Sequence, residues 1–145
     1  MLIKIEKMNL SHLDSIKDKL NTQFDTFWNY NILKSELENP LSEYIVAIYN
    51  AEVIAYAGIW KALDEGHITN IVTRIDLRHN YIGTQMLKKI VEIAKEKNLK
   101  CVTLEVNENN ENAIKLYKKF NFKEVGRRKN YYNNVNDAII MTLNI

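Results

Sequence analysis

One stretch decides the fold: Leu104-Glu-Val-Asn-Glu-Asn-Asn-Glu-Asn-Ala-Ile-Lys-Leu-Tyr117, which passes from a strand pattern to a helix pattern within one polar turn. Apolar and more polar residues alternate over 101–106, which predicts a half-buried strand. Four apolar residues then recur at helical spacing: Ala113, Leu116, Tyr117 and Phe120. That spacing predicts a helix with one apolar stripe, so a strand leads directly into a helix.

Outward from this stretch, apolar residues recur at helical spacing from Ile82 to Ala94, which predicts an amphipathic helix of about four turns. The residues Ser11-His-Leu-Asp14 resemble a capping box and predict a helix to about Leu20. A further helix is expected over about 31–38, and it must end before Pro40. The remaining strands are expected at 2–7, 43–50, 52–63, 67–74, 122–132 and 138–144, with a hairpin at residues 50–51.

This order predicts an α/β fold in which an antiparallel half precedes a βαβ-like half. We expect a mixed, mostly antiparallel central sheet of about six or seven strands, flanked by about four helices. Residues 1–145 are expected to form a single domain, as a monomer or weak dimer, because 145 residues match the size of one domain.

Composition narrows the function classes. A net charge of +2 does not suggest a nucleic-acid-binding protein, which usually carries a clear basic excess. One cysteine excludes an internal disulfide framework, and three histidines without ligand spacing suggest no metal site. No apolar run reaches the length of about 18 residues that a membrane span needs, and the alternating N-terminus does not resemble a signal peptide. We therefore expect a cytoplasmic protein without a membrane partner.

Glu105 is the first candidate catalytic residue, because a carboxylate in the middle of a short apolar strand is uncommon. One interpretation places it on a solvated sheet face, or in an ion pair with a lysine. The other makes it a general base in a cleft, with its proton affinity raised by partial burial.

Tyr117 is the second candidate. A tyrosine on an apolar helical stripe is usually a core residue, but a phenol that keeps its proton at pH 7 can also act as a general acid. Cys101 is a poor nucleophile candidate, because no histidine is adjacent to it in the sequence.

Two further stretches suggest ligand binding. Arg78-His-Asn-Tyr-Ile-Gly83 opens the long helix, and a helix N-terminus offers free backbone N–H groups to a phosphate or pyrophosphate. Near the C-terminus, Arg127-Arg-Lys129 is followed by Tyr131 and Tyr132. That combination fits a solvated strand end or a substrate wall, and less well a stacking surface for nucleic acid.

These sites, in this order, resemble the GNAT superfamily of N-acetyltransferases, and within it the bacterial ribosomal-protein-alanine N-acetyltransferases. The stretch 104–117 is similar to the family's Leu-Glu-Val strand, asparagine and Ala-Ile-x-Leu-Tyr helix. Arg127-Arg-Lys-Asn-Tyr-Tyr132, Asp137-Ala-Ile-Ile-Met141 and the early segment from Phe27 to Leu37 also match. The resemblance covers nearly the whole chain and implies a GNAT-like domain.

The resemblance implies roles for these residues. Glu105 corresponds to the family's general base and Tyr117 to its general acid, while Tyr131 and Tyr132 lie where the substrate is expected. The backbone of the strand at 71–73 corresponds to the pantetheine site, and the turn at 79–84 corresponds to the pyrophosphate loop. The implied acetyl-CoA contacts are Ile71, Val72, Thr73, Arg78, His79, Asn80, Tyr81, Ile82, Gly83, Thr84 and Asn110.

Two positions depart from the family pattern. Tyr81 stands where the first glycine of the loop is usual, so its Cβ and ring could narrow the loop or demand a different backbone angle. Asn121 replaces the glycine that usually follows the tyrosine helix. Asparagine tolerates left-handed geometry, so we expect the helix cap to survive.

The activity that the resemblance implies is direct transfer of acetyl from acetyl-CoA to a protein N-terminal α-amino group, with the N-terminal alanine of a ribosomal protein as the expected acceptor and with no metal. Three alternatives stay open, of which a nucleic-acid-binding module is the least favoured, given the net charge of +2. A small-molecule amine N-acetyltransferase would share the cofactor site, and a non-catalytic acyl-CoA-binding GNAT domain would bind without turnover.

Overall fold

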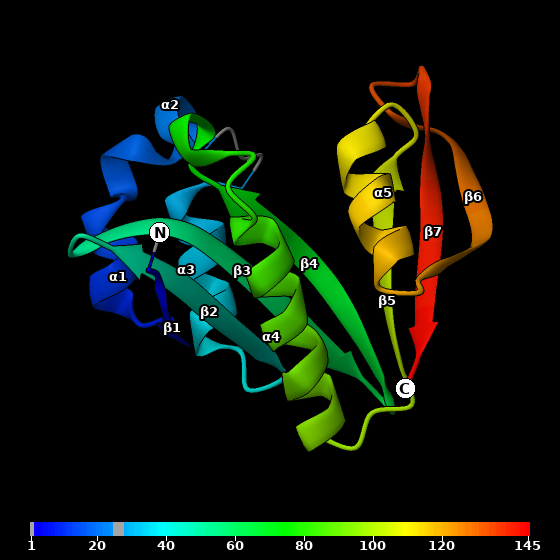
Figure 1. Ribbon diagram of the computed structural model, residues 1–145, viewed down its shortest axis with the longest axis horizontal. Helices are drawn as coiled ribbons and strands as arrows, with labels where there is room; N and C mark the ends of the chain where they lie inside the picture. The colour runs from blue at the N-terminus through cyan, green and yellow to red at the C-terminus, as the bar shows by residue number, and fades with distance from the viewer. Residues whose placement is uncertain (1, 25–27) are drawn as a thin grey trace.

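The computed structural model describes residues 2–24 and 28–145 and contains, in that part of the chain, a seven-stranded sheet in the order β1-β2-β3-β4-β5-β7-β6. The strands are β1 (Lys4–Lys7), β2 (Ser42–Tyr49), β3 (Glu52–Ala62), β4 (Glu65–Thr73), β5 (Cys101–Asn107), β6 (Lys123–Tyr132) and β7 (Asn136–Asn144). Strands β4 and β5 run parallel and the other neighbours run antiparallel, which confirms the predicted sheet (Figure 1).

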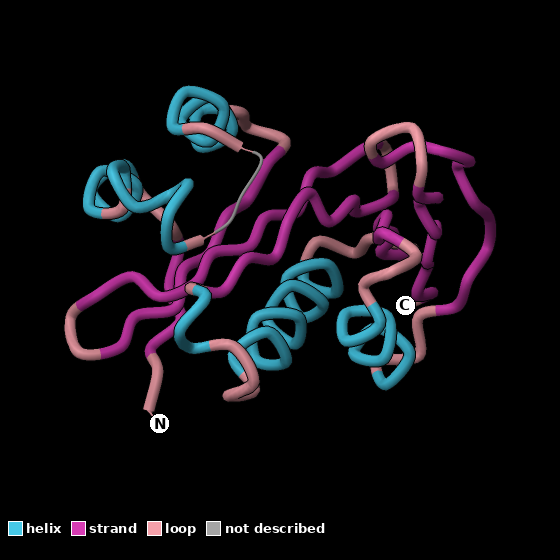
Figure 2. The backbone as a smooth tube through the Cα atoms, turned by 90° about the horizontal axis from the view of Figure 1, so that it is seen from above, coloured by secondary structure: helices cyan, strands magenta, loops and turns pink. Residues whose placement is uncertain are grey.

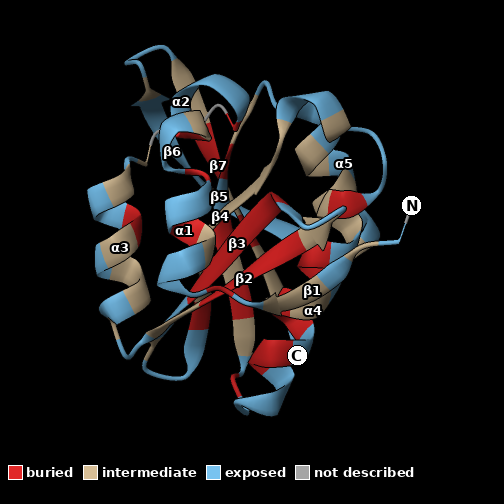
Figure 3. Ribbon diagram, turned by 90° about the vertical axis from the view of Figure 1, so that its left-hand side faces the viewer, coloured by how far each residue is buried: buried red, intermediate tan, exposed pale blue. Residues whose placement is uncertain are grey.

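Helices cover both faces of the sheet. One face carries α1 (Leu10–Ser15), α2 (Leu20–Gln23) and α3 (Tyr30–Glu38), and the other carries α4 (Ile82–Glu96) and α5 (Glu111–Lys119) (Figure 2). Two 3₁₀ turns, Lys17–Lys19 and Ile75–Leu77, complete the helical elements of the described residues. Each face of the sheet has its own hydrophobic core, and β2 and β3 are buried between them (Figure 3).

The predicted start of the first helix is wrong by two residues. Asn9 rather than Ser11 is the N-cap: its Oδ1 accepts the N–H of His12 at 2.9 Å, and the Nδ1 of His12 accepts the N–H of Asn9 at 3.0 Å. Asparagine caps a helix at least as well as serine, and the histidine completes the box in place of an acid. The helix also breaks at Ile16 (φ −114°, ψ 8°), so two short helices replace one and five α-helices flank the described sheet instead of about four.

The other predicted elements are confirmed to within about two residues. Asn50 and Ala51 both adopt positive φ (51° and 63°), the geometry of a two-residue hairpin turn between β2 and β3. Helix α3 ends at Glu38, and Asn39 before the proline is extended. Phe27, part of the early segment of the resemblance, lies outside the described residues. No helix of the described residues is long and apolar enough to span a membrane.

Strands β4 and β5 create the space for a site. They pair over three positions, from Glu65 opposite Cys101 to His67 opposite Thr103, and then diverge (Figure 1). In β4, Thr69 is an extra residue in the ladder with β3, where the register shifts between Gly58 and Ile59. Such a bulge bends the strand and increases its twist. Strand β5 stays paired with β7, so the bent β4 separates from it.

Candidate active site

A cleft of about 530 Å³ lies where β4 and β5 diverge. Strand β5 contributes Glu105 to it, and β6 contributes Arg128, Tyr131 and Tyr132. The opposite wall includes side chains that the sequence analysis did not single out: Trp28, His67 and Thr69. Trp28 precedes α3 and lies far from β5 in the sequence, so no local pattern could have assigned it to the cleft.

Glu105 occupies the cleft on the face of β5 that the alternation predicted, opposite the buried Val102, Leu104 and Val106. Its Oε1 lies 2.9 Å from the Nε of Arg128, with side-chain exposures of 30% for the carboxylate and 57% for the guanidinium. The ion pair expected in one interpretation therefore exists, but with an arginine of β6 instead of a lysine. Glu105 also lies in a cleft, as the interpretation as a general base requires.

The two tyrosines of β6 face the cleft together because the strand is irregular there. Arg128 pairs with Ala138 and Tyr132 with Asn136, so three residues of β6 lie opposite a single residue of β7. Within this segment Asn130 has positive φ (53°), and its N–H donates to Oδ1 of Asp137 at 3.0 Å. Consecutive side chains of a regular strand point to opposite faces, so the irregularity is what brings Tyr131 and Tyr132 into one wall.

Tyr117 lies on α5 and is not one of the described residues that line the cleft; its ring centroid is 5.8 Å from that of Phe122. Burial, with a smaller contribution from Tyr132, raises the pKa of Tyr117 to about 12. Partial burial and the carboxylate of Glu105 likewise raise the pKa of Tyr132. The three groups are thus electrostatically connected, and both phenols hold their protons at neutral pH.

The C-terminus of α5 fixes Tyr117. Asn121 is left-handed (φ 69°), its N–H donates to the carbonyl of Lys118, and the N–H of Phe122 donates to the carbonyl of Tyr117, both at 3.0 Å. This is a Schellman cap built on asparagine, as expected from the sequence. At the other end, Asn110 is the N-cap of α5, and its Oδ1 accepts the N–H of Ala113 at 3.2 Å. This capping role was not predicted.

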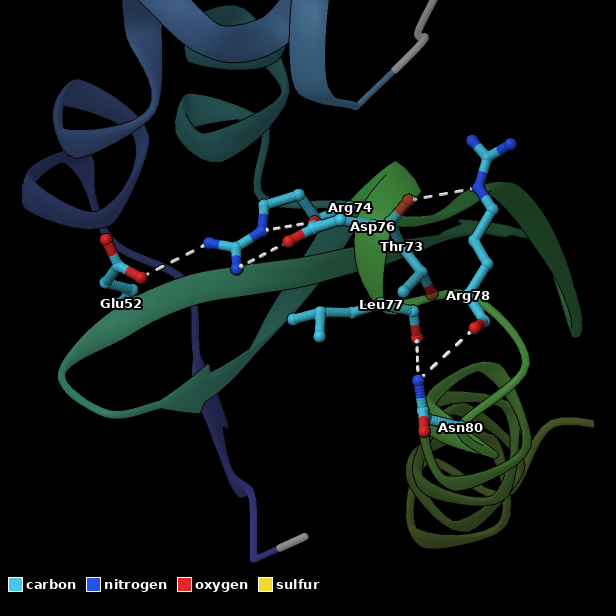
Figure 4. A network of polar contacts seen from close by, with 7 residues as sticks. All are labelled: Glu52, Thr73, Arg74, Asp76, Leu77, Arg78 and Asn80. Atoms are coloured by element: carbon cyan, nitrogen blue, oxygen red, sulfur yellow. Dashed lines mark hydrogen bonds and ion pairs between the residues drawn. The ribbon is translucent and has the colours of Figure 1, made fainter.

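The loop between β4 and α4 is held by charged and polar contacts (Figure 4). Arg74 donates to both carboxylate oxygens of Asp76 at 2.7 and 3.2 Å and contacts Glu52 at 3.3 Å. Asn80 Nδ2 donates to the carbonyls of Leu77 (3.1 Å) and Arg78 (3.3 Å). Arg78 contacts the Thr73 carbonyl at 3.4 Å through Nε, and its guanidinium extends away from the Arg74 cluster (Figure 4).

Tyr81 keeps the backbone angle that a glycine would take. It is left-handed (φ 62°, ψ 17°) and forms the N-cap of α4 without a side-chain hydrogen bond, and its side chain is 76% exposed. This left-handed angle is one that glycine adopts without strain, so the substitution leaves the backbone at position 81 in a conformation that a glycine could also take. The first turn of α4, which contains Gly83 and Thr84, therefore begins with backbone N–H groups that no side chain of Tyr81 caps.

The end of β4 and the start of α4 offer backbone groups of the kind that an acyl-CoA needs. The ladder between β4 and β5 ends at His67, so the β5-facing backbone of Ile71–Thr73 is not part of a ladder with β5. Those residues remain in register with β3 on their other side. An uncapped helix N-terminus next to this strand end suits a pyrophosphate.

The surroundings of Cys101 do not activate its thiol. It lies at the start of β5, where partial burial and the acidic side chains of Glu65 and Asp64 raise the pKa of its thiol. A raised thiol pKa lowers the fraction of the reactive thiolate.

A parallel strand pair that opens into a cleft with a carboxylate and phenols, and a helix N-terminus without a side-chain cap, are features that an α/β group-transfer enzyme can use. The chain belongs to the Acetyltransferase (GNAT) family, whose sequence profile matches residues 10–122, and it is an N-acetyltransferase of that family. The predicted fold and family are both confirmed.

Two relatives cover almost the whole chain. A Bacillus subtilis (strain 168) protein, itself assigned provisionally as a [ribosomal protein bS18]-alanine N-acetyltransferase, is 35% identical and covers 97% of this chain and 95% of its own length. An N-alpha-acetyltransferase of Sulfolobus acidocaldarius is 30% identical and covers 95% and 90%. The crystal structure of the ribosomal-protein-S18-alanine N-acetyltransferase from Escherichia coli has the same fold, with a TM-score of 0.90, 24% identity and coverage of 99% and 94%.

Proposed function

We propose that this chain transfers the acetyl group of acetyl-CoA to the α-amino group of a protein N-terminus in the cytoplasm. The first acceptor to test is a ribosomal protein that begins with alanine, because a relative 35% identical over 97% of the chain carries that assignment. The observation that carries the proposal is Glu105, a carboxylate in a cleft where the parallel strands diverge.

The acceptor class follows from the ionisation of amines. An α-amino group has a pKa of about 7.7–8.0, so roughly a tenth to a sixth of it is neutral at pH 7. A lysine amine, with a pKa near 10.4, is neutral about one time in 2,500. The neutral amine is the nucleophile. A single carboxylate base can therefore deprotonate a protein N-terminus far more easily than a lysine side chain.

Each residue then has a defined task. Bound acetyl-CoA supplies the acetyl group as an activated thioester. Glu105 takes the proton of the amine through a water molecule, and Tyr117, whose pKa of about 12 keeps it protonated, donates a proton to the leaving sulfur. A backbone N–H of the strand at 71–73 polarises the acyl oxygen, and the first turn of α4 holds the pyrophosphate. Tyr131 and Tyr132 orient the acceptor peptide through their hydroxyl groups.

Two measurements test the proposal. Peptides with a free N-terminus, including one that begins with alanine, are incubated with acetyl-CoA, and peptide mapping by mass spectrometry locates the acetyl group. The same peptide with a blocked N-terminus and a free lysine should react poorly. Preferential acetylation of lysine, spermidine or an aminoglycoside over every N-terminal peptide contradicts the proposed acceptor.

Cofactor binding is tested separately by thermal melts with increasing acetyl-CoA. A ligand that binds the folded state alone stabilises it by about 2.7 kcal/mol at a hundredfold excess over its Kd. No shift in the melting temperature at millimolar acetyl-CoA, together with no heat of binding in calorimetry, removes the cofactor assignment.

A further inference from the structure

Arg128 lies across the acceptor side of the cleft and has two partners there. Its Nε is 2.9 Å from Oε1 of Glu105, and the centre of its guanidinium lies 5.7 Å from the ring centroid of Tyr131. The second distance is within the range of a cation–π contact. Arg128 thus bridges the carboxylate of β5 and an aromatic residue of its own strand, at a position where 57% of its side chain is exposed.

An acceptor ammonium and Arg128 compete for the same carboxylate. Under the proposed function, the N-terminal ammonium and the water that relays its proton must approach Glu105, and that carboxylate is already paired. Glu105 is the one acid among the described residues that line the cleft, so no second carboxylate can accept either cation. Two cations on one carboxylate repel each other, and the exposed pair with Arg128 is weak enough to be replaced.

From this geometry we infer that Arg128 is the resident counter-ion of Glu105, and that the ammonium group of the acceptor displaces it. This inference rests on the proposed function. The displaced guanidinium keeps its contact with the ring of Tyr131, so it moves away from Glu105 without losing both partners. Acetylation turns the ammonium into a neutral amide, and Arg128 then returns to Glu105. Arg128 is therefore a positioning residue that weakens acceptor binding and does not take part in the chemistry.

A double-mutant cycle tests the inference by calorimetry, with an N-terminal alanine peptide titrated into the full-length protein in the presence of CoA. Arg128→Gln should tighten peptide binding by about 1.5- to 5-fold, the factor that corresponds to an exposed ion pair. In the Glu105→Gln background, where the ion pair is absent, the same Arg128→Gln change should have no effect. Lys123→Gln, which removes the same charge from an exposed position at the start of β6, is the matched control and should change the affinity in neither background.

Steady-state kinetics give a second readout. Arg128→Gln should lower KM for the peptide by the same 1.5- to 5-fold factor, with no increase in kcat. A lower kcat at unchanged KM would mean that Arg128 orients Glu105, which overturns the displacement. An equal effect of Arg128→Gln in both backgrounds overturns it too, because the effect would not pass through Glu105. If the wild-type protein binds no N-terminal peptide, both the proposed function and this inference fail. If it binds the peptide but Arg128→Gln leaves the affinity unchanged in both backgrounds, only the inference fails.

Discussion

Replacing Tyr117 with phenylalanine separates the chemistry of its hydroxyl from the packing of its ring. The ring contact with Phe122, 5.8 Å between centroids, survives the change, and so does the Schellman cap that fixes the residue on α5. If Tyr117 donates the proton to the leaving sulfur, Tyr117→Phe should lower kcat by about 10²–10⁴-fold at pH 7. Acetyl-CoA binding should stay close to that of the wild type.

The partly buried side chain of Tyr117 also predicts that stability depends on pH. The pKa of Tyr117 is about 12 in the folded protein against 10.0 for an ordinary tyrosine. The folded state therefore holds this proton more tightly than the unfolded state does. The resulting stabilisation is fully present below pH 10 and is lost as the pH rises towards 12. Two pKa units correspond to roughly 3 kcal/mol.

Urea unfolding at several pH values between 9 and 12 measures this contribution. The free energy of unfolding of the wild type should fall by about 2–3 kcal/mol more than that of Tyr117→Phe over this range. Tyr81→Phe, at a side chain that is 76% exposed, controls for the loss of a surface hydroxyl. Parallel curves for wild type and Tyr117→Phe would show that the protein does not shift the pKa of this hydroxyl, and undiminished turnover would show that the hydroxyl is not the proton donor.

Three further predictions concern other parts of the site. Glu105→Gln should lower kcat/KM about 10²–10⁴-fold, most strongly at low pH where the amine is protonated, and a pH–rate profile identical to that of the wild type would exclude Glu105 as the base. A left-handed non-glycine residue costs about 1–2 kcal/mol, and Tyr81→Gly removes that cost but gives the unfolded chain more conformational freedom. Urea unfolding should therefore show a free energy of unfolding that is higher by up to about 1 kcal/mol, and a lower value would show that Tyr81 is not strained. Asp137→Ala removes the acceptor of the Asn130 N–H and should raise KM for the peptide more than for acetyl-CoA. Asp137→Asn, which keeps an Oδ1 acceptor, should restore the peptide KM, and failure of that rescue would assign the effect to lost charge.

The sequence predicted what depends on local periodicity. The stripe of α4 from Ile82 to Ala94 and the alternation of β5 each determine one buried face, because burial of that face outweighs other local preferences. Contacts between distant segments could not be predicted in this way. Trp28 reaches the cleft only because α3 packs on the sheet. The partner of Glu105 is Arg128, which lies on the second strand away in the order β5-β7-β6.

In this chain asparagine occupies many of the left-handed backbone positions where glycine is usual. Ten non-glycine residues of the described part have positive φ, six of them asparagine, while the four glycines have none. Asn98 and Asn121 end α4 and α5, and Asn130 turns β6 so that its tyrosines face the cleft. Asparagine visits left-handed geometry more readily than other non-glycine residues, since its short polar side chain bonds locally. A missing glycine in a family motif therefore does not by itself indicate a lost turn, and in this chain the same holds for Tyr81, which keeps the left-handed angle at the entrance to α4.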